Sequence, residues 1–454
     1  MSTRLLVVGG DAAGMSAASQ ARRRRDDLQI VALERGRWTS YSACGIPFVV
    51  GGEVGSVDDL VVRSPREFRE KYRIDARTGH EAVALDLDAR TVEVVDHGHG
   101  RTYQLGFDLL HLATGARPVR PDLPGVDGAH VHGVQTLEDA AHLLEHVQGD
   151  GPQRVVVVGG GYIGLEMAEA FARRGCPSVT VVEQAAEVMG SLDPDMGALV
   201  TAALRHHGVE VRTGVAVTGF PPGGGVATAD GELPADLVLL GLGVAPHTGL
   251  AAAAGLATGV RGALVVDACQ QAVLVSGGRA DGVWAAGDCC QSFHLVSRAA
   301  VHAPLGTHAN KQGRVAGINI GGGYATFPGV VGTAVTRVCA TEVARTGLSS
   351  AEADRAGLVH ESVRITSSTR AGYYPGAGEI VVKMLAERGS GRLLGAQLVG
   401  AEGAAKRVDV VATALTAGMT ADDLVGLDLS YAPPFSPVWD PVQVAARRLA
   451  RTSA

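Results

Sequence analysis

Aromatic residues and cysteines are scarce in this sequence. Phenylalanine, tryptophan and tyrosine make up 4% of the 454 residues, whereas 62 residues are glycine and 46% are hydrophobic. This balance is typical of parallel strands that are covered by helices and joined by many tight turns. A chain of this length predicts two or three domains, each with a substantial core.

The six cysteines include no Cys-x-x-Cys pair. Their spacing fits neither a zinc site nor a dense disulfide framework, so we expect no metal site and a reducing, cytoplasmic location. The chain also lacks a long apolar run near its start, because the stretch 5–8 is too short for a signal or membrane segment. The net charge of −7 argues against a broad nucleic-acid-binding surface.

A strand, a glycine turn, a helix and a second strand follow one another at the start of the chain. Residues 4–8 predict the first strand, and a helix is expected from Met15 to about Arg25. The second strand ends in Glu34, twenty residues after Gly14. In this arrangement the turn amides and the helix dipole hold a pyrophosphate, and the acid accepts a hydrogen bond from a ribose hydroxyl. Asp11 replaces the middle glycine, so a coincidental βαβ unit is the alternative interpretation.

The same pattern returns, complete, over residues 154–183. Four valines lead into the glycine turn 159–164, and the strand after the next helix ends in Glu183. Two such folds imply two dinucleotides, and the natural pair is a flavin and a nicotinamide. Because Gln184 rather than a basic residue follows Glu183, the sequence favours NADH over NADPH. An arginine elsewhere in the chain leaves NADPH open.

A lone cysteine, Cys44, lies about ten residues after the acid of the first fold. Its segment 40–48 reads Ser-Tyr-Ser-Ala-Cys-Gly-Ile-Pro-Phe. Val49 stands where a redox dithiol would place its second sulfur, so any chemistry at Cys44 uses a single protein sulfur. The alternative is a small buried side chain, which is what most isolated cysteines are.

Further segments carry a resemblance that extends over essentially the whole chain. They are His-Leu-Ala-Thr-Gly-Ala at 111–116, Val-Trp-Ala-Ala-Gly-Asp at 283–288, Ala-Asn-Lys-Gln-Gly-Arg at 309–314, Gly-Tyr-Tyr-Pro-Gly at 372–376 and Tyr-Ala-Pro-Pro-Phe-Ser at 431–436. With the Cys44 segment, they resemble the single-cysteine branch of the FAD-dependent pyridine nucleotide–disulfide oxidoreductases. That branch contains coenzyme A–disulfide reductases, water-forming NADH oxidases, NADH peroxidases and persulfide reductases.

The resemblance implies an α/β fold with two Rossmann-like dinucleotide-binding domains of the glutathione reductase type and a C-terminal α/β dimerisation domain. It places an FAD-binding domain at 1–115 and 246–323, an NAD(P)H-binding domain at 116–245 and an interface domain at 324–454. It implies FAD and NADH, or NADPH, as cofactors, and a homodimer. The residues that it assigns to the cofactors are Gly9, Ala13, Gly14, Glu34, Arg35, Ala113, Thr114, Gly115, Asp288, Gly159, Gly161, Tyr162, Ile163, Gly164, Glu183 and Gly243.

Two of these residues have specific expectations. Asp288 is expected to bind the ribityl chain of the flavin, and a helix N-cap ahead of a long helical segment is the alternative. Tyr162 is expected to swing aside when the nicotinamide docks. Cys289 and Cys290, which follow Asp288, have no role in the family and are predicted to pack on a helix. His302 and His308 precede the 309–314 segment, and either could touch the flavin.

By the same resemblance Cys44 is the nucleophile, and Tyr374 and Tyr431 reach the disulfide site, Tyr431 from the partner subunit. Tyr373 could equally be the important residue, and core tyrosines are the alternative. The residues implied to bind a phosphate-bearing substrate of the coenzyme A type are Gln20, Arg23, Ser40 and Lys71. A solvated helix end is the alternative for the four arginines 22–25. Ala43 stands where the family often has asparagine.

The predicted function is electron transfer from NAD(P)H through FAD to Cys44, which reduces a low-molecular-weight disulfide or persulfide, foremost coenzyme A disulfide or a coenzyme A persulfide. One alternative is a water-forming NADH oxidase or NADH peroxidase with a sulfenic acid at Cys44. Those enzymes carry a histidine in the first glycine loop, where Ala12 stands here. A flavoprotein that senses redox state without catalysis is the other alternative.

Overall fold

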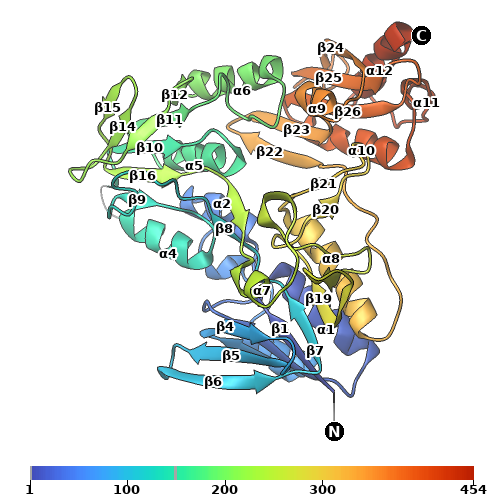
Figure 1. Ribbon diagram of the computed structural model, residues 1–454. Helices are drawn as coiled ribbons and strands as arrows, with labels where there is room; N and C mark the ends of the chain where they lie inside the picture. Colours follow the sequence, from blue (N-terminus) through green and yellow to red (C-terminus); the bar gives the residue numbers. More distant parts are fainter. Residues whose placement is uncertain (1–2, 148–150, 454) are drawn as a thin grey trace.

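The computed structural model describes residues 3–147 and 151–453, so the outermost ends of the predicted domains and residues 148–150 lie outside the described residues. Three large sheets follow one another along the path of the chain (Figure 1). None of the helices in the described part of the chain is long and apolar enough to cross a membrane.

The first sheet has six strands in the order β18-β19-β7-β1-β2-β3. Its strands are β1 (Arg4–Val8), β2 (Gln29–Glu34), β3 (Ile74–Thr78), β7 (Leu109–Leu112), β18 (Gln271–Val273) and β19 (Arg279–Ala285). The chain thus leaves this sheet after β7 and returns to it at β18. Helices α1 (Ala12–Arg24), α3 (Pro65–Tyr72) and α8 (Gly306–Ile320) and the antiparallel sheet of β4 (His80–Asp86), β5 (Thr91–Asp96) and β6 (Arg101–Gly106) accompany it.

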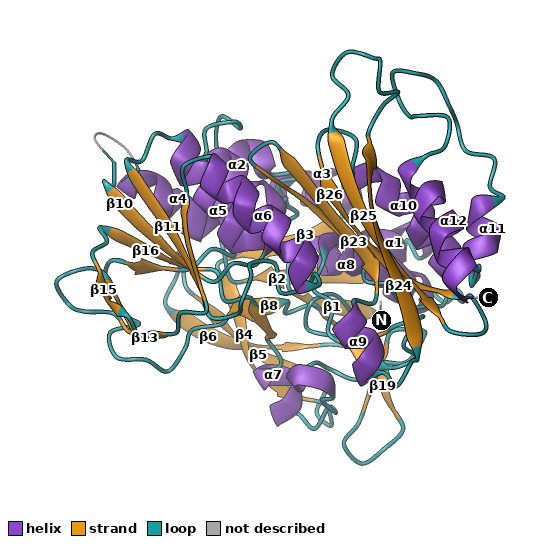
Figure 2. Cartoon of the chain, turned by 90° about the horizontal axis from the view of Figure 1, so that it is seen from above, coloured by secondary structure: helices purple, strands orange, loops and turns teal. Residues whose placement is uncertain are grey.

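The second sheet has five parallel strands in the order β12-β11-β10-β16-β9. Its strands are β9 (Val131–His132), β10 (Arg154–Val158), β11 (Ser178–Glu183), β12 (Glu210–Thr213) and β16 (Leu237–Leu240). Helices α4 (Leu137–His146), α5 (Tyr162–Arg173) and α6 (Pro194–His206) lie beside it, as does the short α2 (Ile46–Val50) from the first segment (Figure 2). A small sheet of β13 (Val217–Gly219), β14 (Val226–Thr228) and β15 (Gly231–Leu233) follows β12.

Two short strands join the first and second units. Strand β8 (Ala116–Pro118) leads out of the first sheet, and β17 (Val244–Pro246) leads back toward it. They pair antiparallel, with Ala116 opposite Pro246 and Pro118 opposite Val244. The chain therefore crosses between the two units twice at one place. After it returns, α7 (Gly249–Ala253) precedes β18.

The third sheet is antiparallel and has the order β22-β23-β26-β25-β24. Its strands are β22 (Ala334–Val338), β23 (Thr341–Gly347), β24 (His360–Ser368), β25 (Glu379–Glu387) and β26 (Leu393–Gly400). Helices α10 (Val408–Ala417), α11 (Ala421–Val425) and α12 (Pro441–Ser453) lie on its outer side, and α9 (Ser350–Arg355) follows β23 (Figure 2). An all-apolar core of buried side chains joins these helices to the sheet.

Two local predictions need correction. Helix α1 begins at Ala12, three residues before the predicted start, because Asp11 takes the extended N-cap conformation. No helix begins after Asp288, since the short strands β20 (Ser292–Phe293) and β21 (Ala300–Val301) come before α8. The N-cap interpretation of Asp288 is therefore wrong. Cys289 and Cys290 lie in the loop after β19 and are buried in a core that also contains Ala251 of α7.

Candidate functional site

The first glycine loop lies where the carboxyl ends of three parallel strands meet. Val8 pairs with Leu33 on one side and with Leu112 on the other, so the residues after β1, β2 and β7 come together. Gly9 has a φ of 111°, and a Cβ there would overlap with the carbonyl oxygen of Ala113. This close approach requires glycine, because no other residue fits both the backbone angle and the space.

The second glycine loop repeats this geometry. Gly159 has a φ of 103°, and a Cβ there would lie 2.5 Å from the carbonyl oxygen of Gly241. A Cβ on Gly164 would overlap with the carbonyl oxygen of Gly159, just as one on Gly14 would overlap with that of Gly9. The two helices α5 and α1 therefore pack equally closely onto the strands that precede them.

The predicted acids hold their own glycine loops in the same way. Oε2 of Glu34 accepts a hydrogen bond from the amide of Gly10 at 2.9 Å, and Oε2 of Glu183 accepts one from Gly160 at 2.7 Å. The other oxygen of each acid accepts from an amide two residues on, at Gly36 and at Ala185. Each carboxylate oxygen keeps a further lone pair with which it can accept from a ribose hydroxyl.

Asp11 does not disturb the first loop, although it replaces the middle glycine. Its backbone is extended, with φ −110° and ψ −151°, which any residue can adopt. The side chain accepts a hydrogen bond from the amide of Tyr41 at 3.0 Å, and the neighbouring amide of Ser40 donates to the carbonyl of Gly10. Burial raises the pKa of Asp11 to about 7. Asp11 thus ties the segment that carries Cys44 to the first glycine loop.

Asp288 lies at the end of β19, beside the same loop. Burial raises the pKa of its carboxyl to about 6, and that carboxyl has no hydrogen-bond partner among the described residues. Nε2 of His302 contacts the backbone carbonyl of Asp288 at 2.8 Å, whereas His308 is buried on α8 and contacts the carbonyl of Ala303. The Asp288 carboxyl is therefore available to a ligand hydroxyl, and His302 supports its backbone.

These groups fit the cofactors that the sequence implies. Each fold offers the amides of a glycine loop at a helix start, and each has an acid that keeps lone pairs for a ribose. The unpartnered Asp288 carboxyl lies at the first loop only, where it could accept from the polyol chain of a flavin. The first fold thus suits FAD, and the second suits a nicotinamide dinucleotide.

The other residues assigned to the cofactors lie around these two loops. Ala13 is buried in the first turn of α1, and Gly115 and Gly243 have positive φ where β8 and β17 begin. The hydroxyl of Thr114 donates to the carbonyl of His247 at 2.5 Å. Arg35 is exposed, with its guanidinium 3.8 Å from Glu81. These positions stay predictions, since no cofactor contact tests them.

Cys44 lies in a single 3₁₀ turn, Ala43–Gly45, that runs directly into α2. Its side chain is exposed in the chain as described. Desolvation by the surrounding protein raises the pKa of the thiol, and the carboxylates of Glu166 and Asp288 raise it further. Both folds therefore act on this sulfur, Glu166 from α5 and Asp288 from the end of β19. The protein groups alone therefore disfavour the thiolate.

Tyr162 is the first residue of α5, and its side chain contacts a residue outside the second glycine loop. The Ser191 hydroxyl lies 3.5 Å from the Tyr162 hydroxyl, and burial raises the pKa of Tyr162. Glu166, one turn further along α5, accepts a 2.6 Å hydrogen bond from the hydroxyl of Thr336 on β22. Burial and then Glu169 raise the pKa of Glu166, while the Thr336 bond opposes them. The third sheet thus helps to build the site.

The residues predicted to bind substrate phosphate lie on two helices and one loop. Gln20 and Arg23 are adjacent on α1, with Nη1 of Arg23 3.4 Å from Oε1 of Gln20. Lys71 lies on α3, exposed and paired with Glu67 at 3.1 Å. Ser40 has a φ of 50° at the start of the Cys44 segment. The structure brings Gln20 and Arg23 together, and no contact tests the role of any of the four.

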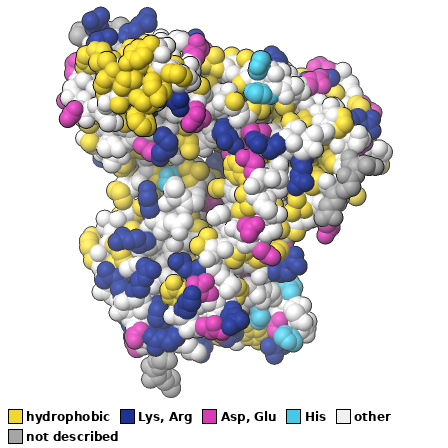
Figure 3. Space-filling view, turned by 180° about the vertical axis from the view of Figure 1, so that it is seen from behind, with side chains coloured by type: hydrophobic (Ala, Val, Ile, Leu, Met, Phe, Trp, Pro, Cys, Tyr) yellow, Lys and Arg dark blue, Asp and Glu magenta, His cyan; other side chains and the backbone are white. Residues whose placement is uncertain are grey.

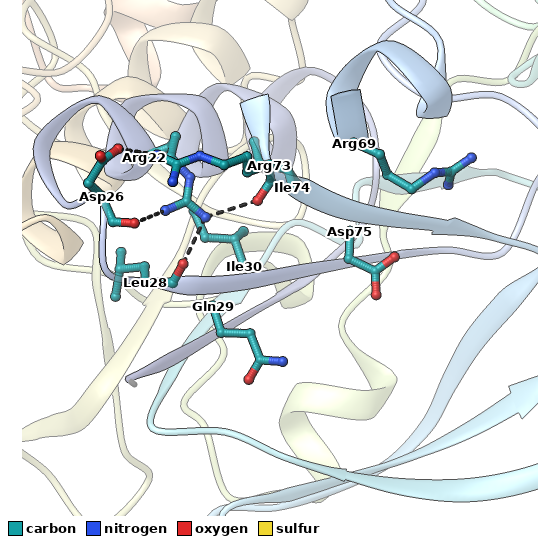
Figure 4. A pocket seen from close by; sticks show the side chains of 9 residues that line it. All are labelled: Arg22, Asp26, Leu28, Gln29, Ile30, Arg69, Arg73, Ile74 and Asp75. Atoms are coloured by element: carbon teal, nitrogen blue, oxygen red, sulfur yellow. Dashed lines mark hydrogen bonds and ion pairs between the residues drawn. The ribbon is translucent and has the colours of Figure 1, made fainter. Parts of the chain in front are cut away.

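The four arginines at the end of α1 are not one solvated group. Arg22 is buried, and its guanidinium donates to five backbone carbonyls, those of Arg25, Asp26, Leu28, Tyr72 and Arg73. Figure 4 shows it at the floor of a pocket that Arg69 and Arg73 also line, together with acidic side chains. The solvated-end interpretation is wrong for Arg22, which joins α1 to the edge of the sheet.

The predicted tyrosines lie in two loops of the C-terminal unit. Tyr373 is 79% exposed, Tyr431 is 48% exposed and Tyr374 is half-buried. Desolvation raises the pKa of Tyr431, and the neighbouring Tyr373 raises it further. Figure 3 shows hydrophobic side chains gathered near the C-terminal end of the molecule. The exposed apolar residues of this region also include Phe435, Val438 and Trp439.

The sequence interpretation gave no role to Glu166 or to the side chain of Asp11. Glu166 stands four residues after Tyr162, so a shared helix face was a signal for it. Asp11 was treated only as a defect in a motif, because its partner Tyr41 lies 30 residues away. Thr336 lies 170 residues from Glu166, and no local pattern connects the two.

Comparison with known proteins places this geometry in a family. Residues 3–303 match the family described as pyridine nucleotide-disulphide oxidoreductase, and residues 333–441 match its dimerisation domain. The chain is 37% identical to the NAD(P)H coenzyme A polysulfide/persulfide reductase of Pyrococcus horikoshii, over 99% of each chain. It is 34% identical to a NADH oxidase of Methanocaldococcus jannaschii, over 98% of each chain.

A solved structure agrees with these matches. The NAD-dependent persulfide reductase from A. fulgidus is 39% identical and superposes with a TM-score of 0.95, over 99% of this chain and 83% of that one. The predicted α/β fold class, with two dinucleotide-binding folds and a C-terminal dimerisation domain, is confirmed. The predicted recognition and the oxidoreductase class are confirmed as well. The chain belongs to the pyridine nucleotide-disulphide oxidoreductase family.

Proposed function

We propose that this protein uses NAD(P)H and FAD to reduce a disulfide or persulfide of the coenzyme A type at Cys44. One observation carries the proposal. An exposed lone thiol lies where Glu166 of the second nucleotide fold and Asp288 of the first both act on it. The names of the Pyrococcus and A. fulgidus proteins support the persulfide or polysulfide as the substrate class.

The division of the chain is part of the proposal. Residues 1–115 and 246–323 bind FAD, residues 116–245 bind the nicotinamide nucleotide, and residues 324–454 form the subunit interface. The paired strands β8 and β17 support the two inner boundaries, since the chain crosses there in both directions. NADH is the preferred donor, because Gln184 offers no positive charge to a 2′-phosphate.

The residues of the chain perform distinct tasks. Bound FAD and NAD(P)H supply hydride transfer and the two electrons that return Cys44 to the thiol. Glu34 and Glu183 accept from the ribose hydroxyls of the two nucleotides, and Asp288 accepts from the polyol of the flavin. Tyr162 covers the site and moves aside for the nicotinamide, away from the hydroxyl of Ser191.

Cys44 performs the sulfur chemistry. Its thiolate attacks one sulfur of the substrate disulfide, forms a mixed disulfide and releases the other half as a thiolate that takes up a proton. One protein sulfur is enough, because the substrate supplies the second. Since desolvation by the surrounding protein, Glu166 and Asp288 raise the pKa of the thiol, a flavin bound beside Cys44 would supply the opposing influence that makes the thiolate available at neutral pH.

A homodimer completes the site in this proposal. The match of residues 333–441 to a dimerisation domain supports it, as does the exposed apolar region near the C-terminus. Tyr431 of one subunit reaches the Cys44 site of the other, together with Tyr374 or with Tyr373, which raises the pKa of Tyr431. Gln20, Arg23, Ser40 and Lys71 bind the phosphates and the nucleotide of the substrate.

An anaerobic substrate panel tests the function. NADH and NADPH oxidation is measured with coenzyme A disulfide, a coenzyme A persulfide, polysulfide and small disulfides without a nucleotide. Coenzyme A-type substrates should be reduced at least tenfold faster than the small disulfides. The NADH oxidase of Methanocaldococcus jannaschii supports the competing function. Faster NADH oxidation in air than with any anaerobic acceptor would establish that function instead.

Replacement of Cys44 tests the mechanism. Cys44→Ser should retain the flavin absorbance and its reduction by NADH, yet lose more than 99% of disulfide reduction. If the variant reduces every disulfide at the parent rate, the proposed role of Cys44 is wrong.

A further inference from the structure

Arg174 joins the second nucleotide fold to the helix that carries Cys44. It follows the last residue of α5, and its Nε donates to the carbonyl of Val50 at 2.6 Å. Its Nη2 lies 3.4 Å from the carbonyl of Val49. These carbonyls lie at the end of α2. That of Val49 also accepts from the amide of Gly52 at 3.1 Å, whereas no backbone amide among the described residues bonds to that of Val50. In the described part of the chain, no other side chain bonds to them.

The position of helix α2 determines the position of Cys44. The 3₁₀ turn that contains Cys44 ends at Gly45, and α2 begins at the next residue, Ile46. The turn is closed by a 2.8 Å hydrogen bond from the amide of Gly45 to the carbonyl of Ser42. No flexible linker separates the thiol from the helix, so a shift of α2 moves the sulfur.

Helices α2 and α5 are joined by close apolar packing as well as by the hydrogen bonds of Arg174. Val49 and Val50 are 1% and 0% exposed and share an apolar core with Phe171 of α5. A Cβ on Gly51 would lie 3.3 Å from the Cα of Ala170, so the two backbones nearly touch. The Arg174 guanidinium therefore completes a packed joint whose position is already defined by apolar contacts.

Helix α5 reaches from this joint to the nucleotide site. Its first residue is Tyr162, in the second glycine loop, and Glu166 lies one turn further on. We infer that Arg174 is a positioning residue for Cys44. It fixes the sulfur relative to the fold that binds the nicotinamide nucleotide, by holding α2 at the far end of α5. This inference rests on the proposed function of Cys44.

The neighbouring arginine provides a matched control. Arg173 is exposed like Arg174, but it pairs with Glu169 at 3.1 Å and with Glu53 at 3.4 Å and does not bond to α2. If Arg173 is removed, Glu53 keeps its ion pair with Arg337. Arg173→Gln therefore removes the same charge from the same turn without touching the end of α2.

Three variants of the holoenzyme, Arg174→Gln, Arg174→Lys and Arg173→Gln, test the inference. In Arg174→Gln we expect about tenfold slower reduction of coenzyme A disulfide, because a small displacement of a reacting group has a large effect on rate. Anaerobic reduction of the flavin by NADH should stay within about twofold of the parent, since it does not involve Cys44. Arg174→Lys keeps the charge and one donor, so it should recover part of the lost rate. Arg173→Gln should behave as the parent.

Alkylation of Cys44 by iodoacetamide supplies a readout that does not depend on turnover. In Arg174→Gln the segment holds the thiol less firmly in its site, so the midpoint of the alkylation pH profile should move from the parent value toward that of free cysteine. The inference is overturned if Arg174→Gln matches Arg173→Gln in both assays, or if flavin reduction and disulfide reduction fall by the same factor. Full turnover in Cys44→Ser would instead refute the proposed function, whereas the alkylation profile would still report on Arg174. If Arg174→Gln does not fold, the same comparison is made with Arg174→Lys.

Discussion

At the scale of single residues, the charges that act on the Cys44 thiol come from different parts of the chain. Glu166 belongs to the second nucleotide fold and Asp288 to the first, and both raise the pKa of the thiol after desolvation has done so. The sequence located the thiol by its motif, but it gave no information about these neighbours. Two substitutions separate the effects of charge and of position.

Glu166→Gln should make Cys44 more reactive at neutral pH. The amide oxygen of glutamine can still accept from Thr336, while the negative charge that opposes the thiolate is lost. The midpoint of the alkylation pH profile should move down, and the rate with iodoacetamide at pH 7 should rise about threefold. Glu210→Gln, at an exposed carboxylate paired with Arg212, is the control. An unchanged or higher midpoint in Glu166→Gln contradicts the prediction.

Asp11→Ala should loosen the start of the Cys44 segment, whereas Asp11→Asn should not. Alanine removes the acceptor of the Tyr41 amide, and asparagine keeps it. Loss of about 1 kcal/mol from one hydrogen bond corresponds to a several-fold faster exchange of the Tyr41 amide proton. Hydrogen exchange at pH 8, where the Asp11 carboxyl is ionised, measures this. Equal exchange rates in both variants would show that the bond does not hold the segment.

At the scale of elements, the two glycine loops are built alike, and the structure shows which of their glycines the fold itself requires. Gly164 lies against the carbonyl oxygen of Gly159, while a Cβ on Gly161 would lie 3.8 Å from the carbonyl oxygen of Gly241, an ordinary contact. Asp11 occupies the position in the first loop that matches Gly161. The middle position is therefore free of packing constraints in both loops. In the second loop its glycine lets a bound pyrophosphate approach the backbone, whereas in the first loop the Asp11 side chain is engaged by the Tyr41 amide.

Gly164→Ala should therefore impair stability, whereas Gly161→Ala should impair NADH binding. Gly164→Ala should lower the melting temperature by several degrees, because its Cβ overlaps with backbone that cannot move away. Gly161→Ala should melt within about a degree of the parent, yet bind NADH at least tenfold more weakly. Thermal melting and NADH titration of both variants check this. A stable Gly164→Ala variant would show that α5 can shift on its sheet.

At the scale of the whole molecule, the third sheet packs against the second nucleotide fold through a buried ion pair. Asp193, 3% exposed, lies 2.9 Å from Nζ of Lys383 on β25. Its carboxylate also accepts from Ser350 and from the amide of Gln397. Burial opposes the ionisation of Asp193, but these bonds outweigh it and lower the pKa. The guanidinium of Arg345 also donates a 2.6 Å hydrogen bond to the carbonyl of Ser191, whose hydroxyl lies beside that of Tyr162.

Lys383→Met should destabilise the protein by about 3 kcal/mol at pH 7, because it leaves Asp193 charged, buried and without its cation. The stabilisation from a carboxyl with a lowered pKa is present above its unfolded pKa and is lost as the pH falls through the folded one. The difference between parent and variant should therefore shrink in acid. Denaturant unfolding at pH 7 and pH 4 measures it. Lys406→Met, at an exposed lysine paired with Asp409, should change stability by less than about 1 kcal/mol.

The sequence by itself determined the two nucleotide folds, their acids Glu34 and Glu183, and the position of Cys44. These features are local, since strand, turn, helix and acid lie within some thirty residues and follow from periodicity and spacing. The N-cap alternative for Asp288 is wrong, because nothing local distinguishes a short hairpin from the start of a helix. Arg22 was placed in solvent for a similar reason, since its carbonyl partners come from two separate segments.

Only the tertiary structure decided how Cys44 is held and what surrounds it. Asp11 reaches Tyr41 across 30 residues, Arg174 reaches Val50 across 124, and Thr336 reaches Glu166 across 170. Contacts over such separations depend on the packing of complete domains, and no spacing rule within a segment encodes them. The motif predicts the chemistry of the lone thiol, but its pKa and its position are properties of the assembled fold.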